Sequence, residues 1–276
     1  MTWQVELGAV VGASIVAAER TFGGSINEAY RVELSDGRSV FVKTHRAPPP
    51  GMYACEAEDL RALGHGPLRV PRVIGHGDAF LALEWLELAG RYADEDFGRG
   101  LAQLHARPQA AADGPHFGAS TGNYLATLPQ TGRAADIATL WTRHRLRPMF
   151  VRLADPSLLA RLEALAARPH LFGPPEPPAL VHGDLWSGNV DACGGAPVIF
   201  DPACYYGHRE IDLAMLLLFG SLSSRFLDAY NEVRPLDDEW RSRVPLWQLY
   251  PLAVHAVLFG GGYGRQIDAA FDQLGL

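Results

Sequence analysis

Apolar and polar positions in the first third of the chain follow the period of β-strands. Residues 26–34 partly alternate between the two classes, and a second strand over 39–45 follows Asp36-Gly37, a pair typical of two-residue hairpin turns. Residues 70–88 predict two short apolar strands joined through Gly75–Asp78. We therefore expect a small sheet in this part of the chain.

One glycine turn and one helix interrupt these strands. Residues 21–25 (TFGGS) predict a short turn between strands, because glycine adopts backbone conformations that other residues avoid. Residues 53–63 have helical spacing, which places Glu56, Leu60 and Leu63 on one face. The first lobe, residues 1–87, is thus predicted to be a sheet that carries one helix.

From residue 94 onward the pattern becomes helical. Helices are predicted over residues 94–106, 135–167 (with a break near Pro148 and Pro156), 208–222 and 244–259. Residues 181–190 lack a helical period, and residues 196–203 predict a buried strand that enters a turn. The fold class is therefore predicted as α+β, with a larger helical lobe over residues 88–276.

Composition limits the classes of protein to which the chain can belong. The 276 residues are 48% hydrophobic and 20% charged, which is typical of a globular protein. The formal net charge of −7 argues against nucleic-acid binding, which needs a clustered basic face. The three cysteines, Cys55, Cys193 and Cys204, lack CxxC spacing, so we expect no disulfide framework or zinc site and a reducing cytoplasm as the compartment.

Two apolar stretches resemble membrane or targeting segments without their full pattern. A signal peptide would carry a positively charged region before its apolar run, and residues 7–18 have none before them. Residues 244–264 carry no charge, but Pro245, Pro251, His255 and several glycines argue against a spanning helix. We expect a soluble protein without a membrane partner.

The segment HGDLWSGN and the later Asp201 carry the candidate chemistry. Phosphoryl transfer from ATP needs a carboxylate that orients the attacking hydroxyl, and oxygen ligands that hold Mg²⁺ against the phosphates. Asp184 can supply the first, and Asn189 and Asp201 the second. Each of these residues alone is also a common turn former, so the prediction rests on their spacing. A hairpin turning at residues 193–195 would bring Asp201 to the same cleft.

Upstream residues complete a nucleotide site of the kinase type. The turn residues Gly23, Gly24 and Ser25 can offer backbone N–H groups to phosphate oxygens. Lys43 follows as the strand lysine. Glu56 is predicted as its partner in preference to Glu58, which points away from the apolar helix face. Because GxxxxGK[ST] is missing from the sequence, a P-loop NTPase is disfavoured.

Over nearly its whole length the chain resembles the fructosamine kinase (ketosamine-3-kinase) branch of the aminoglycoside-phosphotransferase-like, protein-kinase-like fold. The matching segments are FVK (41–43), LEWLEL (83–88), FGRGLAQLH (97–105), GNYLATLPQ (122–130), RHRLRP (143–148), HGDLWSGNV (182–190) and DPACYYGHREIDLA (201–214). Protein kinases would show HRD and DFG where this chain has HGD and DPA. The resemblance implies a two-lobed kinase fold that uses ATP and Mg²⁺.

The resemblance also implies roles for individual residues. Asp184 would be the catalytic carboxylate, Asn189 and Asp201 the Mg²⁺ ligands, and Lys43 and Glu56 the pair that positions the phosphates. The connection between the lobes would hold adenine through the backbone at Glu84, Trp85 and Leu86.

On the acceptor side, the resemblance implies a substrate that faces Asp184. The family phosphorylates the sugar 3-hydroxyl of ketosamines, a deglycation step. Trp186 could stack on the sugar, and His255 matches a substrate-side position, although a core histidine is an equal alternative. Asp212 is expected to anchor the catalytic-loop backbone rather than to touch substrate.

Two other functions remain open from the sequence. The first is a kinase of another small hydroxylated amine, such as an aminoglycoside or a choline-like compound, and the second is a nucleotide-binding pseudokinase. The acceptor is expected to be a small molecule or a glycated amine, and the chain a monomer or a weak dimer.

Overall fold

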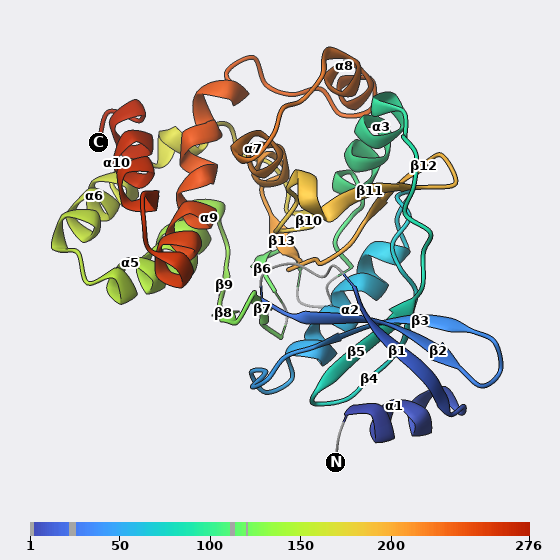
Figure 1. Ribbon diagram of the computed structural model, residues 1–276. Helices are drawn as coiled ribbons and strands as arrows, with labels where there is room; N and C mark the ends of the chain where they lie inside the picture. Colours follow the sequence, from blue (N-terminus) through green and yellow to red (C-terminus); the bar gives the residue numbers. More distant parts are fainter. Residues whose placement is uncertain (1–2, 22–25, 111–113, 120) are drawn as a thin grey trace.

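The computed structural model describes residues 3–21, 26–110, 114–119 and 121–276, and it divides into a strand-rich N-terminal lobe and a larger helical lobe (Figure 1). The N-terminal elements are α1 (Trp3–Val11), β1 (Ile15–Thr21), β2 (Glu28–Leu34), β3 (Ser39–Thr44), α2 (Met52–Gly64), β4 (Val73–His76) and β5 (Phe80–Glu84). Their strands form one antiparallel sheet in the order β1-β2-β3-β5-β4. The predicted sheet and its helix are confirmed.

The two faces of this sheet are covered by different helices. Val40 and Val42 of β3 pack in one cluster with Leu7 of α1, whereas Leu81 and Leu83 of β5 pack with α2. Because side chains alternate between the faces of a strand, Lys43 lies on the face opposite Val42, toward α2. The strand period therefore directs Lys43 to the helix that carries Glu56.

Two turns in the sheet differ from their predictions. The β2–β3 connection is a three-residue loop over 35–37 and not the predicted two-residue turn, because the Leu34 N–H donates to the Arg38 carbonyl at 2.9 Å. Gly37 takes φ +85°, the left-handed conformation that such loops need at their last residue. In the second hairpin, β4 continues through Gly75 to His76, so the turn covers residues 77–79.

The C-terminal lobe combines helices with short strands. Its helices are α3 (Asp94–His105), α4 (Ile137–Thr139), α5 (Arg147–Leu153), α6 (Pro156–Ala166), α7 (Glu210–Leu218), α8 (Ser224–Val233), α9 (Val244–Phe259) and α10 (Tyr263–Gln273), with a π-helix over Leu140–Leu146 and 3₁₀ turns over Pro169–Phe172, Ser187–Asn189 and Trp240–Arg243. Its strands are β6 (Phe117–Gly118), β7 (Asn123–Leu125), β8 (Leu128–Gln130), β9 (Arg133–Ala134), β10 (Ala179–Val181), β11 (Val190–Cys193), β12 (Ala196–Ile199) and β13 (Tyr205–Gly207). The β7–β8 and β11–β12 pairs are hairpins, and the other four strands form a sheet in the order β10-β13-β6-β9.

The predicted helical segment 135–167 is present but is divided. The chain leaves α5 at Ala154, whose φ is +54°, and α6 begins after Asp155, which accepts the Ser157 N–H at 2.9 Å. This is the predicted break before Pro156. At Pro148 the prediction was wrong, because the π-helix continues into α5 without an interruption.

Helices α1, α8 and α10 were not predicted. The last two are amphipathic, so charged residues interrupt the apolar runs that identified α7 and α9. Within α9, Pro251 lies among buried side chains. No helix in the described part of the chain is both long enough and apolar enough to cross a membrane.

Helices α3 and α8 lie side by side, and their contact depends on a glycine (Figure 1). A Cβ at Gly98 of α3 would overlap the carbonyl oxygen of Phe226 in α8. We expect Gly98→Ala to push the helices apart and to lower the free energy of unfolding by about 1–3 kcal/mol, the usual cost of overpacking. Urea denaturation followed by circular dichroism measures this change.

Gly264→Ala in helix α10 is the matched control, because a Cβ there would have no neighbouring atom within 4 Å outside the nearby backbone of the helix itself. Alanine in place of an exposed helical glycine is expected to raise the free energy of unfolding by about 0.5–1 kcal/mol. Equal or greater stability of Gly98→Ala would show that α3 and α8 do not pack through this contact.

Candidate active site

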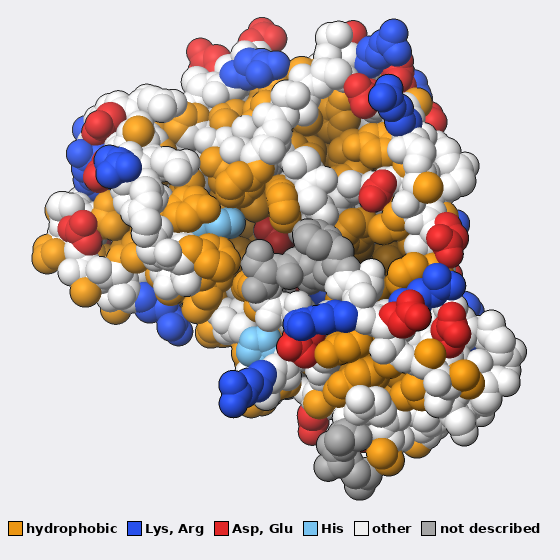
Figure 2. All heavy atoms as spheres, viewed as in Figure 1, with side chains coloured by type: hydrophobic (Ala, Val, Ile, Leu, Met, Phe, Trp, Pro, Cys, Tyr) orange, Lys and Arg blue, Asp and Glu red, His pale blue; other side chains and the backbone are white. Residues whose placement is uncertain are grey.

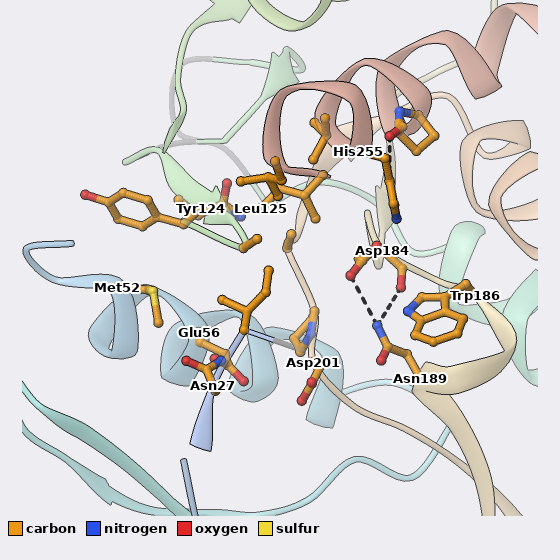
Figure 3. Close-up of a pocket in the computed structure, with 18 of the residues that line it drawn as sticks. Asn27, Met52, Glu56, Tyr124, Leu125, Asp184, Trp186, Asn189, Asp201 and His255 are labelled. Atoms are coloured by element: carbon orange, nitrogen blue, oxygen red, sulfur yellow. Dashed lines mark hydrogen bonds between the residues drawn. The ribbon is translucent and has the colours of Figure 1, made fainter. Parts of the chain in front are cut away.

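A cavity of about 460 Å³ lies between the two lobes and is lined by both. Lys43 and Glu56 come from the N-terminal lobe, whereas Asp184, Asn189 and Asp201 come from the helical lobe. Figure 2 shows apolar side chains gathered around the hollow between the lobes, with a histidine and an acidic side chain inside it. The structure thus brings together the five residues whose spacing suggested phosphoryl transfer, and Figure 3 labels all of them except Lys43.

The loop between β10 and β11 places Asp184 beside Asn189. Asn189 Nδ2 donates to the Asp184 backbone carbonyl at 2.9 Å and to its Oδ2 at 3.3 Å. The 3₁₀ turn over Ser187–Asn189 brings the loop back, as the five-residue spacing predicted. Burial and the negative charge of Asp201 raise the pKa of Asp184 well above its usual range.

A buried carboxylate, Asp212 of α7, anchors this loop. Its oxygens accept the N–H groups of His182 at 2.8 Å and Gly183 at 3.0 Å. The ring of His105 lies 3.1 Å from the same carboxylate through Nε2 and 2.8 Å from the Tyr230 hydroxyl through Nδ1. Burial lowers the pKa of His105, so the neutral ring donates from Nε2 and accepts at Nδ1. The predicted anchoring by Asp212 is confirmed.

Asp201 reaches the site at the end of the β11–β12 hairpin. The hairpin turns at Gly194 and Gly195, both with positive φ, as the sequence predicted. His182 Nε2 lies 3.0 Å from the carbonyl of Phe200, which ties the catalytic loop to the same strand end. Asp201 itself has φ +59°, a conformation that Asp tolerates better than most residues and that is frequent at functional sites.

Lys43 lies between two carboxylates from different parts of the chain. Its Nζ is 2.8 Å from Glu56 Oε1 and 2.7 Å from Asp201 Oδ1, and only 3% of its side chain is exposed. Burial lowers the pKa of Lys43, but attraction to Asp201 and Glu56 outweighs it, so the pKa lies above its usual value. The predicted choice of Glu56 over Glu58 agrees with this geometry.

The donor set fits a hard divalent cation that is shared with nucleotide phosphates. Asn189 uses Nδ2 for Asp184, which leaves its Oδ1 pointing away from that residue (Figure 3). Asp201 uses Oδ1 for Lys43, which leaves Oδ2. Among the described residues no cluster of three or more His, Cys, Asp or Glu could hold a metal alone. Two protein oxygens suit Mg²⁺, which usually completes its shell with phosphate and water.

The other wall of the cavity is aromatic. Trp186 is 38% exposed, and its ring lies edge-on to Phe219 with centroids 5.9 Å apart. The rings of His255 and Phe219 have centroids 5.1 Å apart. His255 Nδ1 lies 2.8 Å from the Pro251 carbonyl, so that Nε2 faces Asp184 (Figure 3). His255 is therefore a cavity residue and not part of the closed core.

Some predicted site residues are not brought to this cavity. Glu84, Trp85 and Leu86 do not line it; the Trp85 indole donates to Glu87 at 2.7 Å and lies under the Arg31 guanidinium. The turn residues Gly23, Gly24 and Ser25 lie outside the described residues. The roles of both groups stay predictions.

Several cavity residues received no role from the sequence. Asp59 of α2, the hairpin residues Asn123 to Ala126, and Phe259 and Tyr263 all line the cavity. The hairpin lies in GNYLATLPQ, which was noted only as a matching segment, and Asp59 follows Glu56 by one helical turn. The bonding partners of the hairpin and of Asp59 are distant in the sequence, so no local pattern indicated a role for either of them.

Buried histidines make the stability of this lobe depend on pH. Burial lowers the pKa of His105, His182 and His208 below the usual 6.5. Below about pH 6.5 the unfolded chain binds protons that the folded chain does not, so the free energy of unfolding falls as the pH falls. These three groups contribute up to about 4 kcal/mol per pH unit to the slope and little above pH 7.5, whereas the buried carboxylates Asp59 and Asp184, whose pKa values are raised, contribute with the opposite sign.

Urea denaturation between pH 7.5 and 5 tests this dependence. His208→Gln should reduce the slope by about 1.4 kcal/mol per pH unit, the value for one proton. His65→Gln, at an exposed position, is the control and should leave the slope unchanged. An unchanged slope in His208→Gln would contradict the assignment of a buried, neutral His208.

Comparison with known proteins agrees with this arrangement. The family model described as fructosamine kinase matches residues 4–275. A protein from Enterococcus faecium named probable ketoamine kinase is 36% identical over 91% of this chain and 92% of its own length. The chloroplastic protein-ribulosamine 3-kinase of Oryza sativa subsp. japonica is 34% identical, covering 91% of this chain and 76% of its own.

A solved structure extends the similarity to the fold. The crystal structure of a Thermobifida fusca protein assigned as a fructosamine-3-kinase superposes with a TM-score of 0.88 and 36% identity, covering 99% of this chain and 98% of the other. The predicted two-lobed kinase fold is confirmed. These similarities place the chain in the fructosamine kinase family.

Proposed function

We propose that this ATP-dependent phosphotransferase transfers phosphate to the sugar 3-hydroxyl of a ketosamine and that Asp184 is its catalytic carboxylate. The observation that supports this most strongly is the convergence of Lys43, Glu56 and Asp201 with Asp184 and Asn189 at one cavity. The family assignment supports the acceptor class, since relatives are named ketoamine kinase and protein-ribulosamine 3-kinase.

Asp184 orients the acceptor hydroxyl and receives its proton. Asn189 bonds to Oδ2, which leaves the other oxygen for the acceptor. Asp212 holds the backbone before Asp184, so the carboxylate keeps its place without rearrangement during the reaction. Fixed orientation of this kind supplies much of the rate in phosphoryl transfer.

Lys43, Asn189 and Asp201 act on the phosphate side. Lys43 is already held by two carboxylates and presents its positive charge to the phosphates of ATP. Asn189 Oδ1 and Asp201 Oδ2 would hold Mg²⁺, which neutralises charge on the phosphates when bound. The backbone at Glu84–Leu86 and the turn at Gly23–Ser25 would complete the nucleotide site.

Trp186 and His255 form the acceptor side. The exposed Trp186 ring offers an apolar face to a sugar, and Gly188 permits its orientation because a Cβ there would overlap the ring. His255 Nε2, across from Asp184, accepts a hydrogen bond from a sugar hydroxyl when neutral. A cavity of about 460 Å³ suits a small acceptor.

The two alternatives are disfavoured. An aminoglycoside- or choline-like acceptor has no support from the family assignment, which covers nearly the whole chain. A pseudokinase would be expected to lack at least one of the five phosphoryl-transfer residues, all of which are present.

Turnover of a panel of acceptors tests the proposal. We expect ATP consumption with fructosyl- or ribulosyl-amines and none with an aminoglycoside or choline. Asp184→Asn should lower kcat by about 10²–10⁴-fold, because the amide cannot accept the proton. The fold should be retained, as circular dichroism can show.

Asp238→Asn is the matched control, since this exposed carboxylate lies away from the cavity and should leave kcat unchanged. Unaltered turnover in Asp184→Asn would remove the mechanism. Turnover of choline or an aminoglycoside alone would keep the mechanism and discard the ketosamine acceptor.

A further inference from the structure

The β7–β8 hairpin of the helical lobe is attached to α2 of the other lobe. Asn123 Nδ2 donates to Asp59 Oδ2 at 2.9 Å, and the Tyr124 hydroxyl donates to the Pro50 carbonyl at 2.9 Å. A weaker contact joins the Cys55 thiol to the Gly122 carbonyl at 3.6 Å. The hairpin also lines the cavity through Tyr124 and its neighbours, opposite the helix that carries Glu56 (Figure 3).

Asp59 connects this hairpin to the segment that follows Asp201. Its Oδ2 accepts the backbone N–H of Cys204 at 2.9 Å as well as the Asn123 amide. Asn123 Nδ2 in turn donates to the Cys204 carbonyl at 2.7 Å. Asp59, Asn123 and the Cys204 backbone therefore bond pairwise, and they come from α2, β7 and the residue just before β13.

These bonds add a second connection between α2 and the segment after Asp201, beside the one that Lys43 makes. Asp59 lies one helical turn after Glu56, and Cys204 lies three residues after Asp201. Glu56 and Asp201 both bind Lys43, while Asp59 and Cys204 bind each other. The same helix is thus fixed to the same segment at two points, once through Lys43 and once through Asp59.

The chemistry of Asp59 argues against a contribution to stability alone. Burial raises its pKa to about 7, and the groups that oppose the rise are the neutral Asn123 amide and Cys204 N–H. No cation of the described residues forms an ion pair with it. A mostly buried carboxylate without a cation costs stability that a well-packed apolar residue would not.

We propose that Asp59 and Asn123 are positioning residues, which hold α2 against the segment after Asp201 so that Lys43, Glu56 and Asp201 are set for nucleotide phosphates. This inference rests on the proposed function in that the aligned groups are those that bind ATP. Neither residue touches the reacting atoms. They act by fixing the direction of the Lys43 ammonium group.

Nucleotide binding tests this role without any acceptor. The dissociation constant of a non-hydrolysable ATP analogue with Mg²⁺ is measured by calorimetry for Asp59→Ala, Asn123→Ala and Asp59→Asn. Each alanine variant should weaken binding about tenfold, equivalent to the loss of one hydrogen bond to a charged or buried group. Asp59→Asn should stay within about twofold of the original protein, because its Oδ1 can accept both hydrogen bonds that Oδ2 of Asp59 accepts.

Glu58→Ala is the matched control, since it removes an exposed carboxylate from the same helix. Thermal unfolding of every variant separates positioning from stability. If the alanine variants have lower melting temperatures but bind the ATP analogue with an unchanged dissociation constant at temperatures where they are folded, the role is structural and the proposal is overturned. If Asp59→Ala does not fold, Asn123→Ala decides, because it removes the bonds to both Asp59 and Cys204.

The two proposals can fail separately. An original protein that binds the analogue but phosphorylates no ketosamine would contradict the proposed acceptor and leave the binding comparison intact. Equal binding by Asn123→Ala, Glu58→Ala and the original protein would contradict the positioning role while ketosamine turnover stands.

Discussion

The site depends on one buried cation. The ammonium group of Lys43 is almost fully removed from water, and Glu56 and Asp201 compensate for that loss from two different lobes. Removing one carboxylate would leave a buried charge partly unpaired, which is far more costly than losing an exposed ion pair. The relative position of β3, α2 and the segment after β12 is therefore fixed by an interaction that also places a positive charge at the cavity.

The catalytic loop is held by a second buried charge, and the two arrangements meet at the cavity. Asp212 accepts hydrogen bonds from backbone N–H groups of the loop and from the neutral His105 ring, so Asp184 and Asn189 face the cavity on a rigid support. One side of the cavity carries the charged residues around Lys43, and the other side is formed by aromatic rings around Trp186 and His255. This division fits the transfer of phosphate to a sugar hydroxyl of a small ketosamine, as expected of a fructosamine kinase family member.

Prediction from the sequence succeeded where local pattern and chemistry coincide. The position of Lys43 after the hairpin and the helical period of α2 indicated the Lys43–Glu56 contact, and the spacing of HGDLWSGN indicated that Asn189 returns to Asp184. It failed where tertiary contacts decide. Helices α8 and α10 bury only one face, so their charges concealed them. Asp59 and Asn123 lie far apart in the sequence, and their bond exists only once the hairpin meets α2.

The identity of the phosphorylated atom tests the central claim most directly. A fructosamine labelled with ¹³C in the sugar is incubated with the enzyme, ATP and Mg²⁺, and the product is examined by ³¹P and ¹³C NMR. The account predicts one phosphate ester on the 3-hydroxyl, with carbon–phosphorus coupling centred on C3. A phosphate ester on another hydroxyl, or an unaltered sugar after ATP has been consumed, would contradict it.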